Sequence, residues 1–168
     1  MLILNAGVSG HKGKQFDIEE EDYDLTFAVN VKAVFFFMKD SLELLKKATN
    51  GASVLITSSL SGVHPGKIVG VYAMSKASVI NMAKWLSHEL MDYNIRVNAI
   101  APGFTRTNMV KDAVEIFEKY LPKKALANPD EIANVALMIC SPSDGSFING
   151  ETYVLSGGYP HPKLNFKL

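Results

Sequence analysis

The sequence predicts an α/β protein whose parallel sheet is covered by helices on both faces. Short apolar segments that end in glycine, serine or proline turns alternate with longer segments of helical periodicity. Two of these predicted helices are apolar on more than one side, as expected of helices covered on two faces. A chain of 168 residues is short for two domains. We therefore expect one domain over residues 1–158 and an irregular tail over residues 159–168.

The composition excludes several classes of protein. Seventeen basic and seventeen acidic side chains cancel, so the positive surface of a nucleic-acid or anionic-membrane binder is not expected. No apolar run approaches the roughly 18 residues of a membrane span. Cys140 is the only cysteine and lies in an apolar segment, so we interpret it as a buried hydrophobic residue. A cytoplasmic protein without a nucleic-acid or membrane partner is the expectation.

The first half of the chain contains two predicted strands and two predicted helices. Residues 1–4 form a short apolar run that ends at a glycine turn, which indicates a buried strand. Asp17 followed by Glu20 is typical of a helix N-cap with its capping-box partner, and this predicts a short helix ending near Asn30. Apolar residues then recur at helical spacing up to Leu45, and residues 53–57 form a second buried strand before a serine-rich turn.

The second half continues the alternation. Residues 71–91 form a long helix, and residues 95–100 form a strand that is stopped by Pro102 and Gly103. The segment Asn128-Pro129-Asp130-Glu131 predicts a capped helix start, with proline in the first turn and the helix running to about Cys140. Residues 152–155 form a last strand.

A tyrosine and a lysine give the first indication of chemistry. Tyr72 and Lys76 are four residues apart on a predicted helix, so their side chains share one face. A nearby ammonium favours the phenolate by roughly 1–3 pKa units, and such a pair could exchange a proton with an alcohol or carbonyl oxygen. Taken alone, the spacing is also typical of an ordinary amphipathic helix whose lysine extends to solvent.

A serine at the end of a predicted strand strengthens this interpretation. Ser59 stands thirteen residues before Tyr72, at the strand edge where ligands bind in open α/β sheets. Ser58 is the rival, because neighbouring residues of an extended segment point in opposite directions and one of the two faces the site. The spacing to Tyr72 favours Ser59.

Five ordered segments together resemble the short-chain dehydrogenase/reductase family, in its classical branch similar to 3-oxoacyl-carrier-protein reductases. The likeness covers residues 1–159. The matching segments are Asn5-Ala6-Gly7; Asn30 with Ser59, Tyr72 and Lys76; Arg96-Val97-Asn98 through Pro102-Gly103 to Thr107; Pro129-Asp130-Glu131-Ile132-Ala133; and Ile148-Asn149-Gly150 through Gly157-Gly158. The resemblance implies a Rossmann-like fold.

The resemblance also implies an activity and a role for each residue. It implies an NAD- or NADP-dependent oxidoreductase that interconverts a secondary alcohol and a ketone, and it does not choose between the two cofactors. Tyr72 would exchange the proton, Lys76 would bind the nicotinamide ribose, Ser59 would hold the reacting oxygen and Asn30 would hold a water. The cofactor would also lie against Asn5, Ala6, Gly7, Tyr72, Pro102, Gly103, Thr105 and Thr107.

The sequence departs from the family pattern at its start. The family's first strands and glycine-rich turn, which hold the pyrophosphate, do not precede Met1. A truncated reading frame, a fragment and a short variant would each explain this, and we expect weak NAD(P) binding by the chain as written. An alternative function is a catalytically silent subunit that serves assembly.

Other expectations concern partners, the lid and metals. In the family, the two helices over residues 30–47 and 71–91 pack across a dimer axis, which predicts a homodimer or homotetramer. Residues 109–124 would form the variable lid of the substrate site, with Val114, Phe117 and Leu121 facing inward. The four histidines lack metal-ligand spacing, so no metal site is expected.

Overall fold

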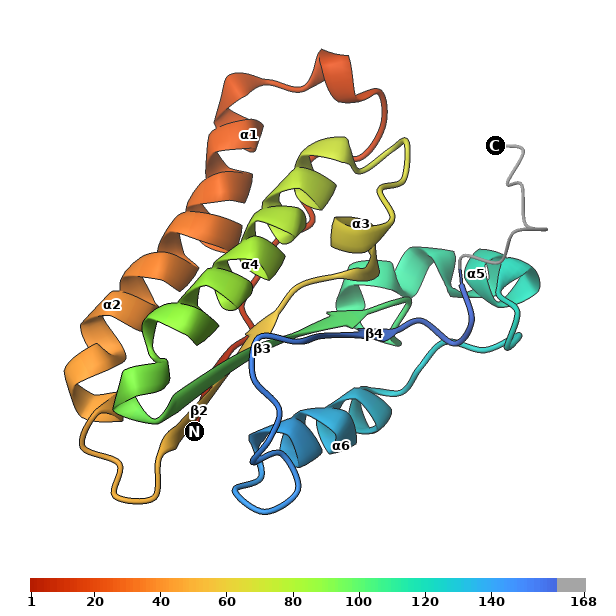
Figure 1. Cartoon of the computed structure of the whole chain (residues 1–168). Helices are drawn as coiled ribbons and strands as arrows, with labels where there is room; N and C mark the ends of the chain where they lie inside the picture. Colours follow the sequence, from red (N-terminus) through yellow and green to blue (C-terminus); the bar gives the residue numbers. More distant parts are fainter. Residues whose placement is uncertain (160–168) are drawn as a thin grey trace.

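The computed structural model describes residues 1–159, so all but the first residue of the irregular tail expected over residues 159–168 lies outside the described part. The described chain alternates strands and helices (Figure 1). In chain order these are β1 (Leu2–Leu4), α1 (Glu20–Phe27), α2 (Ala33–Leu45), β2 (Ala52–Thr57), α3 (Leu60–Val63), α4 (Gly70–Glu89), β3 (Ile95–Pro102), α5 (Val114–Tyr120), α6 (Pro129–Cys140) and β4 (Thr152–Leu155). Among residues 1–159, no helix is both long and apolar enough to cross a bilayer.

The four strands form one parallel sheet, as the sequence predicts, and their order in it is β1-β2-β3-β4. Leu4 pairs with Ile56, and Thr57 pairs with Ile100, so neighbouring strands end at nearly the same level. Because all strands are parallel, their carboxyl ends share one edge of the sheet. The segments that follow β1, β2 and β3 therefore meet at that edge.

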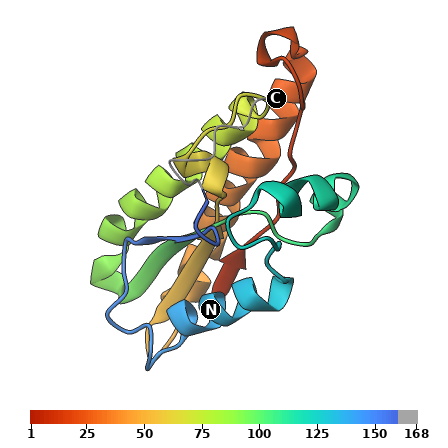
Figure 2. The ribbon, with the colours of Figure 1, turned by 90° about the vertical axis from the view of Figure 1, so that its right-hand side faces the viewer.

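Helices cover both faces of this sheet, and the side chains of β2 alternate between them. Val54 and Ile56 pack into the core formed with α2 and α4, whereas Leu55 packs with Ile139 of α6. Figure 1 shows α2 and α4 on one side of the sheet and α6 on the other, and Figure 2 shows the same layers after a 90° turn. The last connection, from β3 to β4, crosses on the α6 face while the strand order continues in one direction. It therefore has the opposite hand to the two connections before it.

The prediction that a helix ends near Asn30 is wrong. Asn30 lies in a π-helical turn, η2 (Ala28–Lys32), which joins α1 directly to α2. A π turn closes hydrogen bonds five residues apart, as from Ala33 N–H to Ala28 O, and so inserts one extra residue into a continuous helix. The sequence carries no helix breaker here, and the turn is stabilised by the buried contacts of Asn30 described below.

The predicted capping box of Asp17 and Glu20 is also wrong. Asp17 belongs to a separate 3-10 turn, η1 (Gln15–Asp17), and α1 has Glu19 at its N-cap without a side-chain hydrogen bond. Acidic side chains in the first turn of α1 still interact favourably with the helix dipole, as expected. The second predicted cap is confirmed: Asn128 and Glu131 form a capping box at the start of α6. Cys140 is buried and free, as expected.

Replacing Asn128 by alanine is predicted to destabilise the protein. Loss of an N-cap side chain costs about 1 kcal/mol of the free energy of unfolding, because a backbone N–H at the helix start loses its acceptor. Urea unfolding followed by circular dichroism measures this cost. Asn50→Ala, in the exposed turn before β2, is the control and should change little. An unchanged midpoint for Asn128→Ala would show that the cap contributes nothing.

Candidate active site

The carboxyl edge of the sheet brings together the segments that the sequence singled out. Asn5-Ala6-Gly7 follows β1, Ser59 follows β2 and Gly103 follows β3. Ser59 is the N-cap of α3 and accepts a hydrogen bond from Ser61 N–H at 3.1 Å. Tyr72 lies in the first turn of α4, with its phenol close enough to Ser59 for a side-chain hydrogen bond.

Close packing of α3 against α4 holds Ser59 and Tyr72 in position. A Cβ atom at Gly62 of α3 would lie 2.8 Å from the carbonyl carbon of Lys76, so only glycine allows this approach. The turn after β2 therefore lies directly on the helix that carries Tyr72. No local sequence pattern indicates this role for Gly62, because the contact joins residues of two separate helices.

Ser58 and Ser59 have different partners in the structure. The buried Ser58 Oγ donates to the carbonyl of Lys76 at 2.8 Å, and Ser58 N–H donates to Ile100 O. Its hydroxyl is therefore engaged in joining β2 to α4. Ser59 is half-buried and lies beside Tyr72. Of the two serines, Ser59 is therefore the one that lies beside the Tyr72 phenol.

Lys76 is buried, with 4% of its surface exposed. Its Nζ donates to Thr57 O at 2.9 Å and lies 5.9 Å from the centre of the Tyr72 ring. None of the ion pairs in the described part of the chain involves this ammonium. Because burial penalises the charged form, it lowers the pKa of Lys76 to about 8.

The pKa of Tyr72 differs from the sequence-based expectation. Burial raises the pKa of the phenol above its ordinary value, and the hydrogen bond with Ser59 opposes part of that rise. The lowering expected from Lys76 is not seen, since the ammonium bonds to the Thr57 carbonyl and lies beside the ring rather than on the phenol oxygen. Desolvation therefore dominates at this phenol in the structure.

Asn30 is completely buried, and its side-chain amide is fully used. Its Oδ1 accepts from Val8 N–H at 2.9 Å, while its Nδ2 donates to Val8 O at 2.9 Å and to Ser75 Oγ at 3.0 Å. Ser75 in turn donates to Tyr72 O at 2.7 Å. Sequence reasoning missed Ser75, which connects Asn30 to the helix of Tyr72 inside the tyrosine–lysine motif.

The predicted cofactor-lining residues occupy the same edge, with different environments. A Cβ at Gly7 would lie 3.0 Å from Lys76 Nζ, so Gly7 is in close contact with the site, whereas Asn5 and Ala6 are exposed. Gly103 N–H donates to Leu155 O at 2.9 Å, which fixes the turn after β3. The remaining three are the half-buried Pro102 and Thr105 and the exposed Thr107, which is the N-cap of the turn η4 (Asn108–Ala113).

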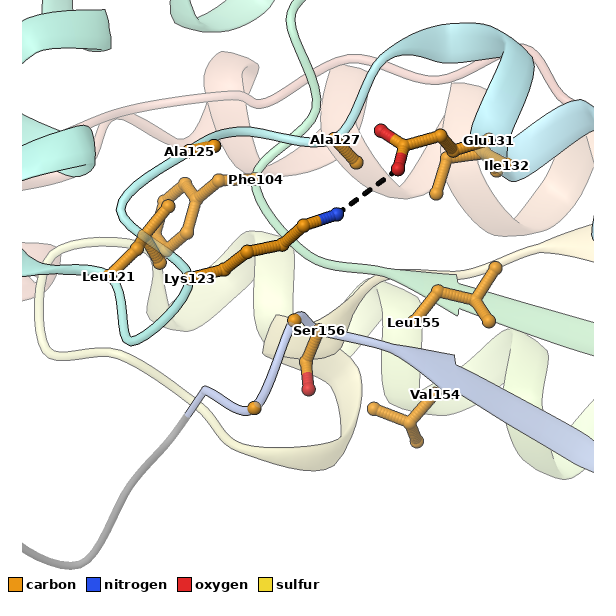
Figure 3. Close-up of a pocket in the computed structure, with 12 residues that line it drawn as sticks. Phe104, Leu121, Lys123, Ala125, Ala127, Glu131, Ile132, Val154, Leu155 and Ser156 are labelled. Carbon is orange, nitrogen blue, oxygen red and sulfur yellow. Dashed lines mark hydrogen bonds and ion pairs between the residues drawn. The ribbon is translucent and has the colours of Figure 1, made fainter.

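A cavity of about 320 Å³ is lined by Phe104, which follows β3, and by Glu131 and Ile132 of α6 (Figure 3). Figure 3 shows the Lys123 side chain reaching Glu131 across it, with Nζ and Oε1 3.1 Å apart. Phe104 and Leu121 line its other end, and Phe104 stacks on Phe117 at 4.0 Å. Asn30, Ser59, Tyr72 and Lys76 do not line this cavity.

The lid segment packs largely as expected. Leu121 is buried, Phe117 stacks on Phe104 and Val114 is half-buried. The apolar side chains of this segment therefore hold it against the end of β3.

In the described residues, no three His, Cys, Asp or Glu side chains are grouped as metal ligands.

Comparison with known proteins agrees with the fold described above. Residues 1–160 match a family model described as enoyl-(acyl carrier protein) reductase. The chain belongs to the classical short-chain dehydrogenases/reductases.

Particular relatives share one third or more of their matched residues with this chain. Dehydrogenase/reductase SDR family member 4 of Sus scrofa is 38% identical over 164 residues, which are 94% of this chain and 58% of the relative. The Homo sapiens protein is 35% identical over 166 residues, covering 95% and 59% of the two chains. An A-factor type gamma-butyrolactone 1'-reductase of Streptomyces virginiae is 34% identical over 149 residues, covering 84% and 58%. The chain thus spans about three fifths of the length of these relatives.

Solved structures give the same fold. A 3-ketoacyl-(acyl-carrier-protein) reductase from Brucella melitensis, complexed with NADH, superimposes with a TM-score of 0.88 and 27% identity, covering 94% of this chain and 66% of that one. A short-chain type dehydrogenase/reductase from Mycobacterium marinum gives 0.86 and 28%, covering 95% and 64%.

The buried Lys76 predicts a rise in stability at alkaline pH. The folded lysine loses its proton near pH 8, whereas an unfolded lysine keeps it to about 10.5. The unfolded chain therefore binds more protons between these values, so the free energy of unfolding increases with pH. Above pH 10 the raised pKa of Tyr72 acts in the opposite direction, which limits the window to pH 8–10.

Urea unfolding at a series of pH values tests this expectation. Lys76→Met keeps the length of the side chain and should abolish the rise between pH 8 and 10. Lys84→Met, an exposed lysine on the same helix, is the matched control and should retain it. A rise that persists in Lys76→Met would assign it to another group.

Proposed function

We propose that this chain carries the proton-transfer half of an NAD(P)-dependent oxidoreductase that interconverts a secondary alcohol and a ketone. The observation that carries the proposal is the convergence of the Tyr72 phenol, the Ser59 hydroxyl and the buried Lys76 ammonium where the strands end. The use of a nicotinamide cofactor is also supported by the 3-ketoacyl-(acyl-carrier-protein) reductase from Brucella melitensis, which is described as a complex with NADH.

The residues at this edge fit the nicotinamide end of such a cofactor. The buried Lys76 ammonium makes none of the ion pairs in the described part of the chain, so it can bind ribose hydroxyls. Gly7 has no side chain, which leaves space next to this ammonium. Thr57 Oγ1 is buried at the same strand end and has no hydrogen-bond partner within residues 1–159. We propose that the nicotinamide cofactor contacts the following residues of this edge: Asn5, Ala6, Gly7, Lys76, Pro102, Gly103, Thr105 and Thr107.

In this proposal, each side chain of the site has a separate role in the reaction. When bound, the cofactor supplies or accepts the hydride at the substrate carbon. Ser59 donates a hydrogen bond to the substrate oxygen and orients it, and Tyr72 gives that oxygen a proton during reduction or takes it during oxidation. Lys76 would bind the ribose hydroxyls of the cofactor, and Asn30 holds the loop after β1 in place through both polar groups of Val8.

Tyr72→Phe is predicted to lower kcat for ketone reduction by roughly 10²–10⁴-fold, because the general acid is lost while the ring remains. The assay follows NADPH and NADH oxidation with a panel of ketones. Tyr93→Phe, at an exposed tyrosine just after α4, is the control and should keep the parent rate.

Direct binding separates this proposal from the alternative of a catalytically silent subunit. Saturable NAD(P)H binding, measured by fluorescence titration, supports an enzyme, and its absence together with no turnover would favour the silent subunit. A Tyr72→Phe protein with undiminished turnover would refute the role given to the phenol.

We also propose that α2 and α4 form a homodimer interface. Both helices expose large apolar side chains, and the stacked rings of Phe35 and Trp85, 6.4 Å apart, join them into one surface. Phe36, Phe37, Leu44 and Met74 are exposed on the same two helices. Contiguous apolar surface of this kind marks association sites, and a twofold axis would place it against its own copy.

Trp85→Glu is predicted to convert a dimer or tetramer into smaller species, since it places a charge in the apolar contact. Sedimentation velocity at micromolar concentration measures the change. Ile116→Glu, at an exposed apolar residue of α5, should leave the mass unchanged. A parent protein that sediments as a monomer would contradict the proposed interface.

A further inference from the structure

The helix that carries Tyr72 begins without a capping residue of its own. Val69 stands at the N-cap of α4 and makes no side-chain hydrogen bond. The first backbone N–H groups of any helix need acceptors from outside the helix. Here Val71 N–H donates to Gln15 Oε1 at 2.9 Å, so the acceptor comes from a loop 56 residues away in the sequence.

Both ends of the Gln15 amide are used at this junction. While Oε1 accepts from Val71, Nε2 donates to Ile68 O at 2.9 Å and to Gly13 O at 3.1 Å. The side chain therefore joins residues on either side of the start of α4 to the loop after β1. A backbone hydrogen bond from Gly13 N–H to Ile68 O, at 3.2 Å, runs beside it.

Gly70, the first residue of α4, makes this contact possible. A Cβ atom at Gly70 would lie 3.2 Å from Gln15 Cγ and 3.5 Å from its Oε1. The missing side chain thus leaves the space that the glutamine fills. Gln15 itself is half-buried in the turn η1.

We propose that Gln15 is a positioning residue for Tyr72, because its amide caps α4 and fixes the first turn from which the phenol reaches Ser59. Tyr72 directly follows the capped Val71, so a change in the direction of this turn moves the phenol. Ser75, bonded to both Asn30 and Tyr72 O, holds the same turn from the inner side. The inference rests on the proposed function for its catalytic meaning, and on the hydrogen bonds of Gln15 and Ser75 for its geometry.

A double-mutant cycle on the titration of Tyr72 tests the inference without requiring turnover. Tyrosines are replaced biosynthetically by 3-fluorotyrosine, whose fluorine makes the phenol more acidic and gives one ¹⁹F resonance for each tyrosine. Tyr72→Phe assigns the resonance. Lys76 is unchanged in every variant, so its effect on the phenol cancels in the comparison.

The expected result follows from the hydrogen bond between Ser59 and Tyr72. Ser59→Ala should raise the pKa of the Tyr72 phenol when Gln15 is present, because the phenolate loses a hydrogen bond. In a Gln15→Met background, where Val71 has lost its acceptor, the rise should fall below half of that. Gln15→Glu keeps an oxygen acceptor at this position and should restore most of it.

Two further variants separate positioning from general stability. Gly70→Ala adds helix propensity but presses on Gln15, so it should reduce the Ser59 effect without lowering the thermal midpoint. Lys14→Met, at the exposed neighbour of Gln15, should leave the full effect in place. A full rise in the Gln15→Met background would overturn the positioning role alone. A Ser59→Ala change that does not raise the pKa in the parent chain would instead refute the site geometry behind the proposed function.

Discussion

A pair of reciprocal hydrogen bonds between the end of β2 and the middle of α4 sets the geometry of the site. The Lys76 ammonium donates a hydrogen bond to the carbonyl of Thr57, and the Ser58 hydroxyl donates one to the carbonyl of Lys76. Each bond joins a side chain of one element to the backbone of the other, so neither element can slide without breaking both. Tyr72 lies one turn before this connection, and Ser59 lies one residue after it.

The loop after β1 is joined to the same helix at two levels. Asn30, in its π turn, binds both backbone polar groups of Val8 and also Ser75, and Gln15 binds the start of the helix. Buried polar networks of this kind are stable only when every member has a partner. In this site the complete pairing of Asn30 fixes the position of the loop, and the extra residue of the π turn places its amide against that loop.

Burial of the Lys76 ammonium is energetically unfavourable. An ammonium with little exposed surface and one neutral acceptor is less stable than the same group in water, which is why burial lowers its pKa. Local destabilisation of this kind concentrates at functional sites, where it is retained for binding or proton transfer. The same reasoning explains why desolvation raises the pKa of Tyr72 until a charged or hydrogen-bonding ligand changes its surroundings.

The sequence by itself determined the alternation of strands and helices, the cap at Asn128 and the meeting of the motif residues at one sheet edge. Periodicity and the parallel order of strands are local or topological properties, and they leave a direct mark on the sequence. Only the tertiary structure decided that the helix continues through Asn30, that Asp17 caps nothing, and that Ser58 and Ser59 have different partners. These outcomes, like the roles of Ser75, Gly62 and Gln15, depend on contacts between residues far apart in the chain. The partner of a side chain across such a distance is set by packing, which no local pattern encodes.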